Sequence, residues 1–438
     1  MSIKRAILIT LLALGMGTKA FGQSAWEYLG PEGGFHGRDD LCVTENAVYV
    51  GMSEDADAGL GLFRFDGSEW SVFAFEGHKI VGVRVWGAND EHLLVREWGG
   101  PEDLLKTWRS EDRGQSWGLA GAVYGVPLAQ ADSQPDQMIC EEFYSADGGW
   151  TWNGSNLAGY TIIGHGQAFD PNNDSIAYYT AGLTDESYRI YKSTNGGVMW
   201  SEVWLEGFRQ LLGIDVEWHD SDHVMACYGI ENRVLITSDA GQDWAWKPSS
   251  FYSREVLSPP WAPACFFVAG SAADETTYEV WWTSDLGDTW TSYSEGLPTL
   301  PGPFWGSWIR IQAHPVDPVL YVALEPSGVW RLDLSGVSGI ESESTYMSDP
   351  RLVSYPNPSN GDVTIAFQGQ GAAVLRSICV VDVMGRVVQT LQAGSDEVTL
   401  RWDGRDRGGR EVASGVYRVV YFRPEGQIGG SQRVLILR

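Results

Sequence analysis

A short motif recurs five times in this chain with the same internal spacing, and it constrains the fold more than any other feature. Each copy places a serine or threonine first, an aspartate or asparagine two residues later, a glycine two residues beyond that, and a tryptophan three residues further. The copies are Ser110, Asp112, Gly114 and Trp117; Ser145, Asp147, Gly149 and Trp152; Ser193, Asn195, Gly197 and Trp200; Thr237, Asp239, Gly241 and Trp244; and Thr283, Asp285, Gly287 and Trp290. Five copies with four matched positions are far beyond chance.

Each copy lies between two short β-rich segments, for example after residues 233–236 and 279–282, as a hairpin turn does. The serine and aspartate oxygens can accept hydrogen bonds from backbone N–H groups of the turn, and glycine adopts a left-handed conformation at little cost. The tryptophan is expected to bury a large ring beneath the turn. The motif therefore predicts a self-capped turn with an apolar anchor, and we expect its aspartates to be structural and not catalytic.

The spacing of the motifs predicts the architecture. Their tryptophans are 35, 48, 44 and 46 residues apart, and a degenerate copy that ends at Trp70 lies 47 residues before Trp117. A period near 45 residues with β character is typical of four-stranded propeller blades. The motifs therefore predict six blades, of which the unit ending at Trp152 is the least regular because it is short.

A seventh unit spans residues 309–332, but its box tryptophan is missing, because Gly339 stands near the expected position. The segment 25–29 contains Trp26, which has no preceding blade and lies 44 residues before Trp70. We therefore predict that the first strand completes the last blade. The result is an all-β, closed seven-bladed propeller over residues 23–337, without an exposed edge at the last blade.

The repeated motif resembles the Asp-box, or BNR, repeat of sialidases, sortilin-type receptors and related β-propellers. The resemblance implies that the boxes are fold elements away from any catalytic centre. It also raises two hydrolase possibilities. Sialidases resemble one another in an Arg-Ile-Pro motif that this sequence lacks, and xyloglucanase-type enzymes look like two propellers around a cleft, whereas one propeller fits here.

Three further segments differ from the propeller in composition. Residues 1–22 have the pattern of a signal peptide, in which two basic residues precede an apolar run and a small-x-small cleavage site. Residues 338–350 are small and polar, as in a linker. Residues 351–438 contain alternating β runs that predict a small Ig-like β-sandwich. From residue 349 onward there are 11 Arg, no Lys and 9 Asp and Glu, although the whole chain has a net charge of −27.

Motifs in this last segment resemble the C-terminal sorting domain of type IX secretion cargo, and equally the Ig-like module of the flagellar hook-capping family. The residues that carry the resemblance are Tyr355, Pro356, Asn357, Pro358, Gly361, Gly385, Gly415 and Tyr417. The Tyr-Pro-Asn-Pro opening and the basic, apolar ending favour the sorting domain. The resemblance implies that the type IX secretion machinery is a partner and that the mature protein is secreted or displayed on the cell surface.

Few residues point to chemistry. Residues 217–223 hold two histidines and three carboxylates and could ligate zinc, but the equivalent segments of other blades favour a turn. The five cysteines are scattered, so we expect free thiols and not a disulfide framework. Trp305 and Trp308 open the seventh blade and could stack on a sugar ring or an apolar side chain at the propeller mouth. We predict no metal and no cofactor.

The acidic charge disfavours nucleic acid and anionic membranes as partners, because both would be repelled. After removal of the signal peptide, no apolar run reaches the roughly 18 residues of a membrane span. The leading interpretation is a secreted binding propeller for an unknown extracellular protein or glycan. The alternative is a secreted glycoside hydrolase, sialidase-like or xyloglucanase-like, that acts on extracellular glycans.

Overall fold

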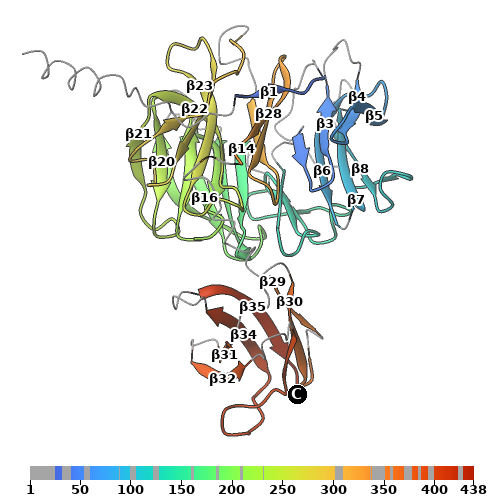
Figure 1. Ribbon diagram of the computed structural model, residues 1–438, viewed down its shortest axis with the longest axis vertical. Coiled ribbons are helices and arrows are strands. Elements are labelled where there is room, and N and C mark those ends of the chain that lie inside the picture. The colour runs from blue at the N-terminus through green and yellow to red at the C-terminus, as the bar shows by residue number, and fades with distance from the viewer. Residues whose placement is uncertain are drawn as a thin grey trace, which may run out of the picture. The chain divides into compact units, whose positions relative to one another are not determined.

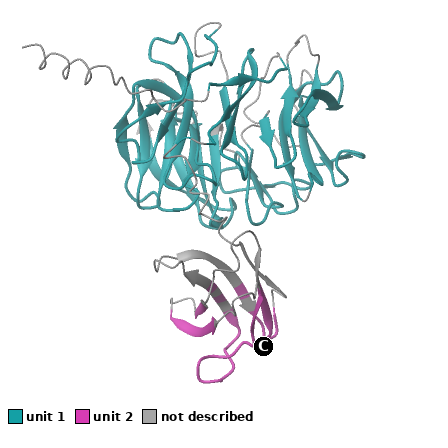
Figure 2. Cartoon of the chain, in the orientation of Figure 1, with its two compact units in different colours: residues 1–341 teal, residues 342–438 magenta. Residues whose placement is uncertain are grey.

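The chain divides into two compact units, residues 1–341 and 342–438, which Figure 2 colours separately. The computed structural model describes residues 25–31, 41–53, 60–87, 89–98, 105–121, 128–158, 162–183, 187–207, 211–229, 231–300, 309–335, 337, 351–355, 359–368, 377–382, 386–392, 399–422 and 428–438. In these residues no helix has the length and apolar character needed to cross a bilayer.

The first unit contains seven four-stranded antiparallel sheets, as expected for a seven-bladed propeller (Figure 1). Blades 1 to 3 are β2 (Leu41–Val43), β3 (Val48–Met52), β4 (Gly61–Phe65) and β5 (Trp70–Ala74); β6 (Ile80–Trp86), β7 (His92–Trp98), β8 (Leu105–Ser110) and β9 (Gly118–Leu119); and β10 (Leu128–Gln130), β11 (Met138–Cys140), β12 (Phe143–Ser145) and β13 (Asn153–Gly154). Blades 4 to 6 are β14 (Ile162–Asp170), β15 (Asn173–Leu183), β16 (Ser187–Ser193) and β17 (Trp200–Gly207); β18 (Leu211–Val216), β19 (Val224–Tyr228), β20 (Arg233–Thr237) and β21 (Ala245–Pro248); and β22 (Phe251–Leu257), β23 (Phe266–Ala272), β24 (Tyr278–Thr283) and β25 (Thr291–Ser292).

Blade 7 combines the two ends of the propeller. It contains β26 (Ile309–Ala313), β27 (Val319–Leu324), β28 (Gly328–Asp333) and, as its outer strand, β1 (Glu27–Tyr28). Figure 1 shows the blue strand β1 beside the orange strand β28, and Tyr28 pairs with Trp330 in the antiparallel register. Trp26 is only 5% exposed, and its indole N–H donates a hydrogen bond of 2.6 Å to the carbonyl of Tyr293 in blade 6. The predicted closure by the first strand is confirmed.

A separate cluster of buried apolar side chains fills each of the seven interfaces between neighbouring blades. Successive residues of a strand point to opposite faces of its sheet, so one strand contributes to two clusters. Leu93 packs against blade 1 and Leu94 against blade 3, while Tyr178 faces blade 5 and Tyr179 faces blade 3. The middle strands are therefore apolar on both faces, which accounts for their continuous hydrophobic sequences.

The short unit that ends at Trp152 forms a complete four-stranded sheet, blade 3, although none of its strands exceeds three residues. Among the described residues its interface with blade 2 has the smallest apolar cluster. Arg109, which is 3% exposed, supplements that cluster: its guanidinium lies 4.5 Å from the centre of the Trp86 ring and 3.8 Å from Asp136 of blade 3. A cation over an aromatic ring replaces part of the missing apolar contact.

The second unit is a two-sheet sandwich, in agreement with the predicted small β domain. One sheet contains β29 (Arg351–Tyr355), β30 (Val363–Gln368) and β33 (Thr399–Trp402), and the other contains β32 (Val387–Gln392), β31 (Ser377–Asp382), β34 (Gly415–Phe422) and β35 (Ile428–Ile436). Trp402 is fully buried between the sheets with Ile365, Val380 and Val419. This core is separate from the propeller clusters, as expected of an independent domain.

Replacing Trp26 with alanine should destabilise the propeller by about 3 to 5 kcal/mol, because it leaves a cavity at the closing blade and an unpaired carbonyl at Tyr293. Urea unfolding followed by tryptophan fluorescence measures this change, since all tryptophans except Trp402 lie in the propeller unit. Tyr28→Ala is the matched control, because Tyr28 lies two residues after Trp26, in β1, but is 43% exposed, and it should cost clearly less. Equal losses in the two variants would mean that closure does not depend on the Trp26 anchor.

Candidate functional site

The five repeated motifs form turns with one shared hydrogen-bond pattern. The backbone N–H of each motif glycine donates to the hydroxyl of the first residue, over 2.8 Å at Gly114 and 3.0 Å at Gly241. That hydroxyl in turn donates to the side-chain oxygen of the motif aspartate, which also accepts from the backbone N–H four residues further on. The other copies repeat these contacts at Gly149, Gly197 and Gly287.

The motif glycines are all in the left-handed region, with φ between 78° at Gly114 and 89° at Gly197. A side chain there would be strained and would also approach the ring of the motif tryptophan, which lies about 3.3 to 3.6 Å from the position of a Cβ atom. Of the five tryptophans only Trp200 is buried, and the others are partly exposed. The expected burial of the ring beneath the turn is therefore complete in one copy and partial in four.

The motif aspartates are held as ionised hydrogen-bond acceptors. At Asp112 hydrogen bonds from Ser116, then from Ser110, lower the pKa of the carboxyl to about 2. Hydrogen bonds from Thr289 and Thr283 likewise hold the pKa of Asp285 below its usual value. Such groups are poor proton donors near neutral pH.

Asp285→Ala should lower the free energy of unfolding by about 1 to 3 kcal/mol, because the Thr289 N–H and two hydroxyl groups lose their acceptor. Asp288→Ala is the matched control in the same turn. It removes only an exposed ion pair to Lys247, which is worth about 1 kcal/mol at most. Urea unfolding of both variants decides the question, and equal stability of the two would argue against a structural role for Asp285.

Polar side chains on the inner strands join neighbouring blades. The Arg310 guanidinium of blade 7 forms an ion pair of 2.6 Å with Glu255 of blade 6. Gln312 accepts a hydrogen bond of 3.1 Å from the Val43 N–H of blade 1, and Arg84 of blade 2 donates to the Leu128 carbonyl of blade 3. The charged groups of Arg310, Glu255 and Arg84 are therefore engaged in contacts between blades. The sequence did not predict these contacts, because each partner is about 40 or more residues away.

Asp215 is the most perturbed carboxyl of this inner set. It accepts backbone hydrogen bonds from Ser258 of blade 6 and from Val216, at 2.8 and 3.0 Å. Desolvation, together with the negative charges of Asp132 and Glu255, raises the pKa of Asp215 to about 8 despite these bonds. The carboxyl is therefore mostly neutral near pH 7.

The raised pKa gives Asp215 a defined effect on stability. The folded state keeps a proton that the unfolded chain releases near pH 4, so this contribution is present below about pH 4 and is lost as the pH rises through about 8. We expect the free energy of unfolding to fall less in Asp215→Asn than in the unmodified chain between about pH 5 and about pH 9. The slopes of the two pH profiles should differ by about 1 kcal/mol per pH unit.

Urea midpoints at the two pH values measure that difference. Asp243→Asn, in an exposed turn position, is the control and should leave the pH dependence unchanged. Parallel pH profiles of Asp215→Asn and the unmodified chain would show that Asp215 is already ionised near pH 7.

The acidic, histidine-containing segment 217–223 follows β18 and forms a turn that is hydrogen-bonded to blade 6. Glu217 is fully buried and accepts hydrogen bonds from the backbone N–H groups of His219 and Ala264, at 2.9 and 2.8 Å. Trp218 donates its backbone N–H to the Ser258 hydroxyl. Within the described part of the chain, no three His, Cys, Asp or Glu side chains are grouped so that they could hold a metal ion.

The two aromatic residues predicted to bind a ligand, Trp305 and Trp308, lie outside the described residues. So do Pro356, Asn357, Pro358 and Gly385 of the sorting motifs. Tyr355 is the last residue of β29 and pairs with Thr364, and Gly415 begins β34 opposite Ile436. Tyr355 and Gly415 thus lie at the ends of their strands.

Two of these motif residues have clear local contacts. The Tyr417 hydroxyl donates a hydrogen bond of 2.9 Å to the Ala413 carbonyl, and its ring lies edge-on to Trp402 at 5.3 Å. This is the geometry of the tyrosine corner of Ig-like sandwiches. Gly361 has φ of 145° and lies against Arg438, whose guanidinium donates to the Gly404 carbonyl at 2.9 Å. The last residue of the chain is therefore fixed onto the sandwich.

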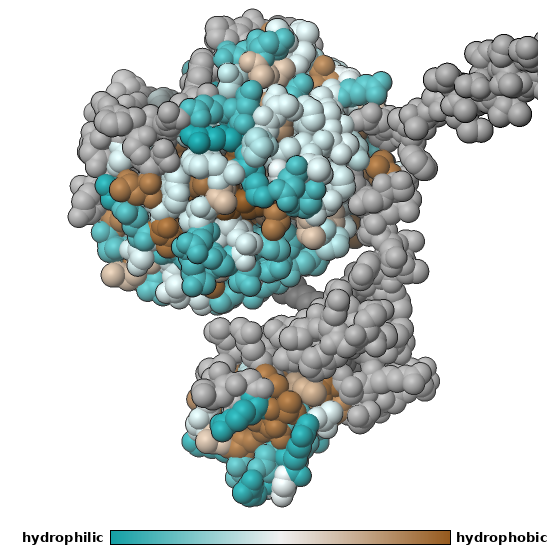
Figure 3. All heavy atoms as spheres, turned by 90° about the vertical axis from the view of Figure 1, so that its left-hand side faces the viewer, coloured by the Kyte–Doolittle hydropathy of each residue, from teal (hydrophilic) through white to brown (hydrophobic). Residues whose placement is uncertain are grey.

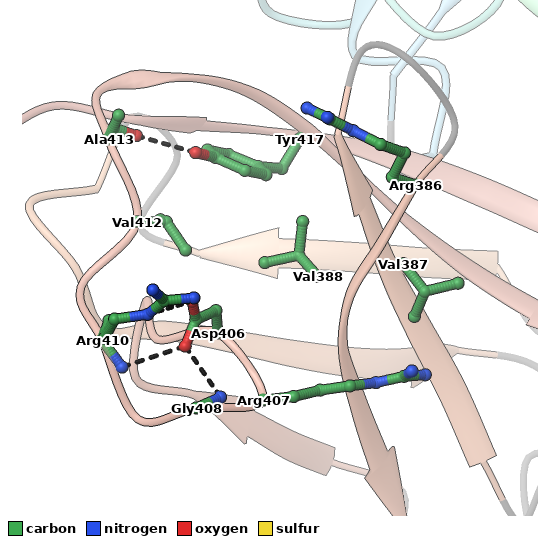
Figure 4. Close-up of a pocket in the computed structure, with 10 residues that line it drawn as sticks. All are labelled: Arg386, Val387, Val388, Asp406, Arg407, Gly408, Arg410, Val412, Ala413 and Tyr417. Carbon is green, nitrogen blue, oxygen red and sulfur yellow. Dashed lines mark hydrogen bonds and ion pairs between the residues drawn. The ribbon is translucent and has the colours of Figure 1, made fainter.

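A hollow of about 480 Å³ opens beside Tyr417, and no sequence pattern predicted it. We call it the basic pocket, and Figure 4 shows its residues. The lining residues are Arg386, Val387, Val388, Asp406, Arg407, Gly408, Arg410, Val412, Ala413 and Tyr417. Apolar side chains occupy its middle and three arginines surround them (Figure 4).

Residues 353–420 match a family model described as a secretion system C-terminal sorting domain. No curated protein matches the chain. Among solved structures the chain is similar to YCF48 from Cyanidioschyzon merolae, with 14% identity and a TM-score of 0.50 over 72% of this chain and 100% of that one. It is also similar to YCF48 bound to a D1 peptide (12% identity, TM-score 0.49, 72% and 96% covered). A third similar structure is PorZ, a surface component of the type IX secretion system of Porphyromonas gingivalis (14% identity, TM-score 0.32, 91% of this chain and 70% of that one covered).

At 14% identity the structure of YCF48 from Cyanidioschyzon merolae bears on the fold alone. The family match identifies the second unit as a type IX sorting domain, which the secretion machinery handles. The chain is therefore a propeller protein that is secreted through the type IX route to the cell surface or the medium.

Proposed function

We propose that the propeller is a rigid, non-enzymatic binding module that acts outside the cell. The inner-strand side chains carry this proposal, because Arg310, Glu255 and their neighbours bind adjacent blades. Such contacts stiffen the ring, and a stiff surface loses little conformational entropy when it binds a partner. The extracellular partner is a protein or a glycan.

A secreted glycoside hydrolase, sialidase-like or xyloglucanase-like, is the competing function. A hydrolase with two catalytic carboxyls holds them about 5 to 10 Å apart around the scissile bond, one as acid and one as base or nucleophile. Asp215 is protonated, as the acid of such a pair must be, but its oxygens accept hydrogen bonds from the backbone N–H groups of Ser258 and Val216. Glu255, the nearby carboxylate, is paired with Arg310. Catalysis by this set would break contacts between blades, so binding is the favoured function.

Trp305 and Trp308 are the proposed ligand contacts, since aromatic rings at a propeller mouth can stack on sugars or apolar side chains. The decisive experiment screens the mature full-length chain on a glycan array and measures release of reducing sugar from the same glycans. A bound glycan without turnover supports the proposal, whereas turnover overturns it. The Trp305→Ala, Trp308→Ala double variant should lose binding at unchanged stability, and Trp98→Ala, which replaces a tryptophan of blade 2 that is 42% exposed, should retain it.

The sorting domain should be required for display outside the cell and not for folding of the propeller. Its core is separate from the propeller clusters, so a chain that ends at residue 345 should fold and melt as the propeller does in the full chain. We expect this truncated chain to accumulate in the periplasm of a host that has the type IX apparatus. Fractionation of the cells measures this, and surface display equal to that of the full chain would contradict the prediction.

A further inference from the structure

The basic pocket of the sorting domain has the chemistry of a docking site for a peptide. We infer that it binds a segment of a partner protein in which acidic side chains flank an apolar one. This inference rests on the proposed function, in which the sorting domain is recognised during export. It identifies the surface of the domain that is recognised.

The middle of the pocket is apolar and preformed. Val412 and Tyr417 are each 8% exposed, and Val388 is partly buried beside them. Tyr417 is fixed at both ends, by its hydroxyl on Ala413 and by its ring on Trp402. Figure 4 shows Val388 and Val412 between the arginines, so an apolar side chain can enter without rearrangement of this floor.

The rim of the pocket is positive. Its one carboxylate, Asp406, is already engaged: it forms an ion pair of 3.0 Å with Arg410 and accepts from the backbone N–H groups of Gly408 and Arg410. The Arg407 guanidinium donates to the neutral hydroxyl of Thr390 at 3.0 Å, and no described carboxylate pairs with it. Arg407 therefore carries positive charge that a carboxylate of a partner can neutralise.

The surroundings favour the same class of partner. The sorting domain has 11 Arg against 9 acidic residues from residue 349 onward, so it attracts anionic groups, whereas the rest of the chain is strongly acidic. Figure 3 shows apolar surface on this unit, bordered by hydrophilic side chains, on the side where Figure 1 labels β31 and β32. Val387, at the edge of the pocket, is 41% exposed there. A peptide with alternating acidic and apolar residues satisfies the rim and the floor together.

Fluorescence anisotropy with defined peptides tests the binding. The probe is a labelled hexapeptide that alternates glutamate and leucine, added to the mature full-length chain. Two matched peptides carry glutamine for glutamate or serine for leucine. The first peptide should bind at least about tenfold more tightly than either control, because each control removes the charge or the apolar contact. Equal binding of the three peptides would overturn the inference.

Arg407→Gln should weaken binding of the acidic peptide about tenfold while the sandwich stays folded, because glutamine can still donate to Thr390 but has no charge. Arg401→Gln is the matched control: Arg401 belongs to the same domain, is exposed, and pairs with Asp362 away from the pocket. Raising the salt concentration should weaken binding to the unmodified chain and to the control. An equal effect of the two substitutions would overturn the inference.

Display in a host with the type IX apparatus separates this inference from the proposed function. Arg407→Gln should reduce the amount of full chain on the surface, and Arg401→Gln should not. If truncation at residue 345 blocks display but Arg407→Gln has no effect, the pocket inference fails and the proposed function stands. If the truncated chain is displayed normally, both fail. Self-association of the chain that depends on Arg407 would identify a second copy as the occupant and would also overturn the inference.

Discussion

The propeller depends on hydrogen bonds between its two ends, where β1 pairs with β28. Each blade is stable only because apolar clusters lie on both of its faces, so an open ring would leave one face of two blades without a partner. The pairing itself is short, with the two residues Glu27 and Tyr28 in register with Arg331 and Trp330. Trp26 strengthens this short pairing, because its buried ring and its indole N–H contact blade 6. The closing strand is thereby attached to two blades at once.

Several of the acidic residues that give the chain its net charge of −27 act as acceptors for backbone N–H groups. The box aspartates accept hydrogen bonds within their own turns. Glu217 accepts the N–H of Ala264, which lies just before β23, and Asp215 accepts the N–H of Ser258 in the next blade. A carboxylate can accept several such bonds at once, which makes it suited to turns in which N–H groups converge. The same kind of hydrogen bond is found with different charge states. Hydrogen bonds from Ser116 and Ser110 keep Asp112 ionised, whereas desolvation keeps Asp215 mostly protonated near pH 7.

The sorting domain differs from the propeller in charge and in core. Asp406 accepts backbone N–H groups of its turn, as the box aspartates do, and arginines add further contacts: Arg438 binds the Gly404 carbonyl and Glu411, and Arg410 pairs with Asp406. The strands of this domain surround a single core centred on Trp402, so its motif residues Gly361 and Tyr417 are explained by local geometry and packing. The basic pocket is a separate feature, because the charge at its rim is not needed for that core.

The sequence by itself determined the repeats, the number of blades, the closing strand and the position of a second β domain. The box motif and the alternation of apolar residues are visible within one unit of about 45 residues. The number of blades and the unclaimed Trp26 follow from comparing successive units along the chain. Four of the five box tryptophans are less buried than the motif predicted. Only the tertiary structure decided which polar side chains cross between blades, that Asp215 is neutral near pH 7, and that Val388, Arg407 and Tyr417 meet around one pocket. These features arise from residues far apart in the chain, and their contacts and burial exist only after the strands have paired.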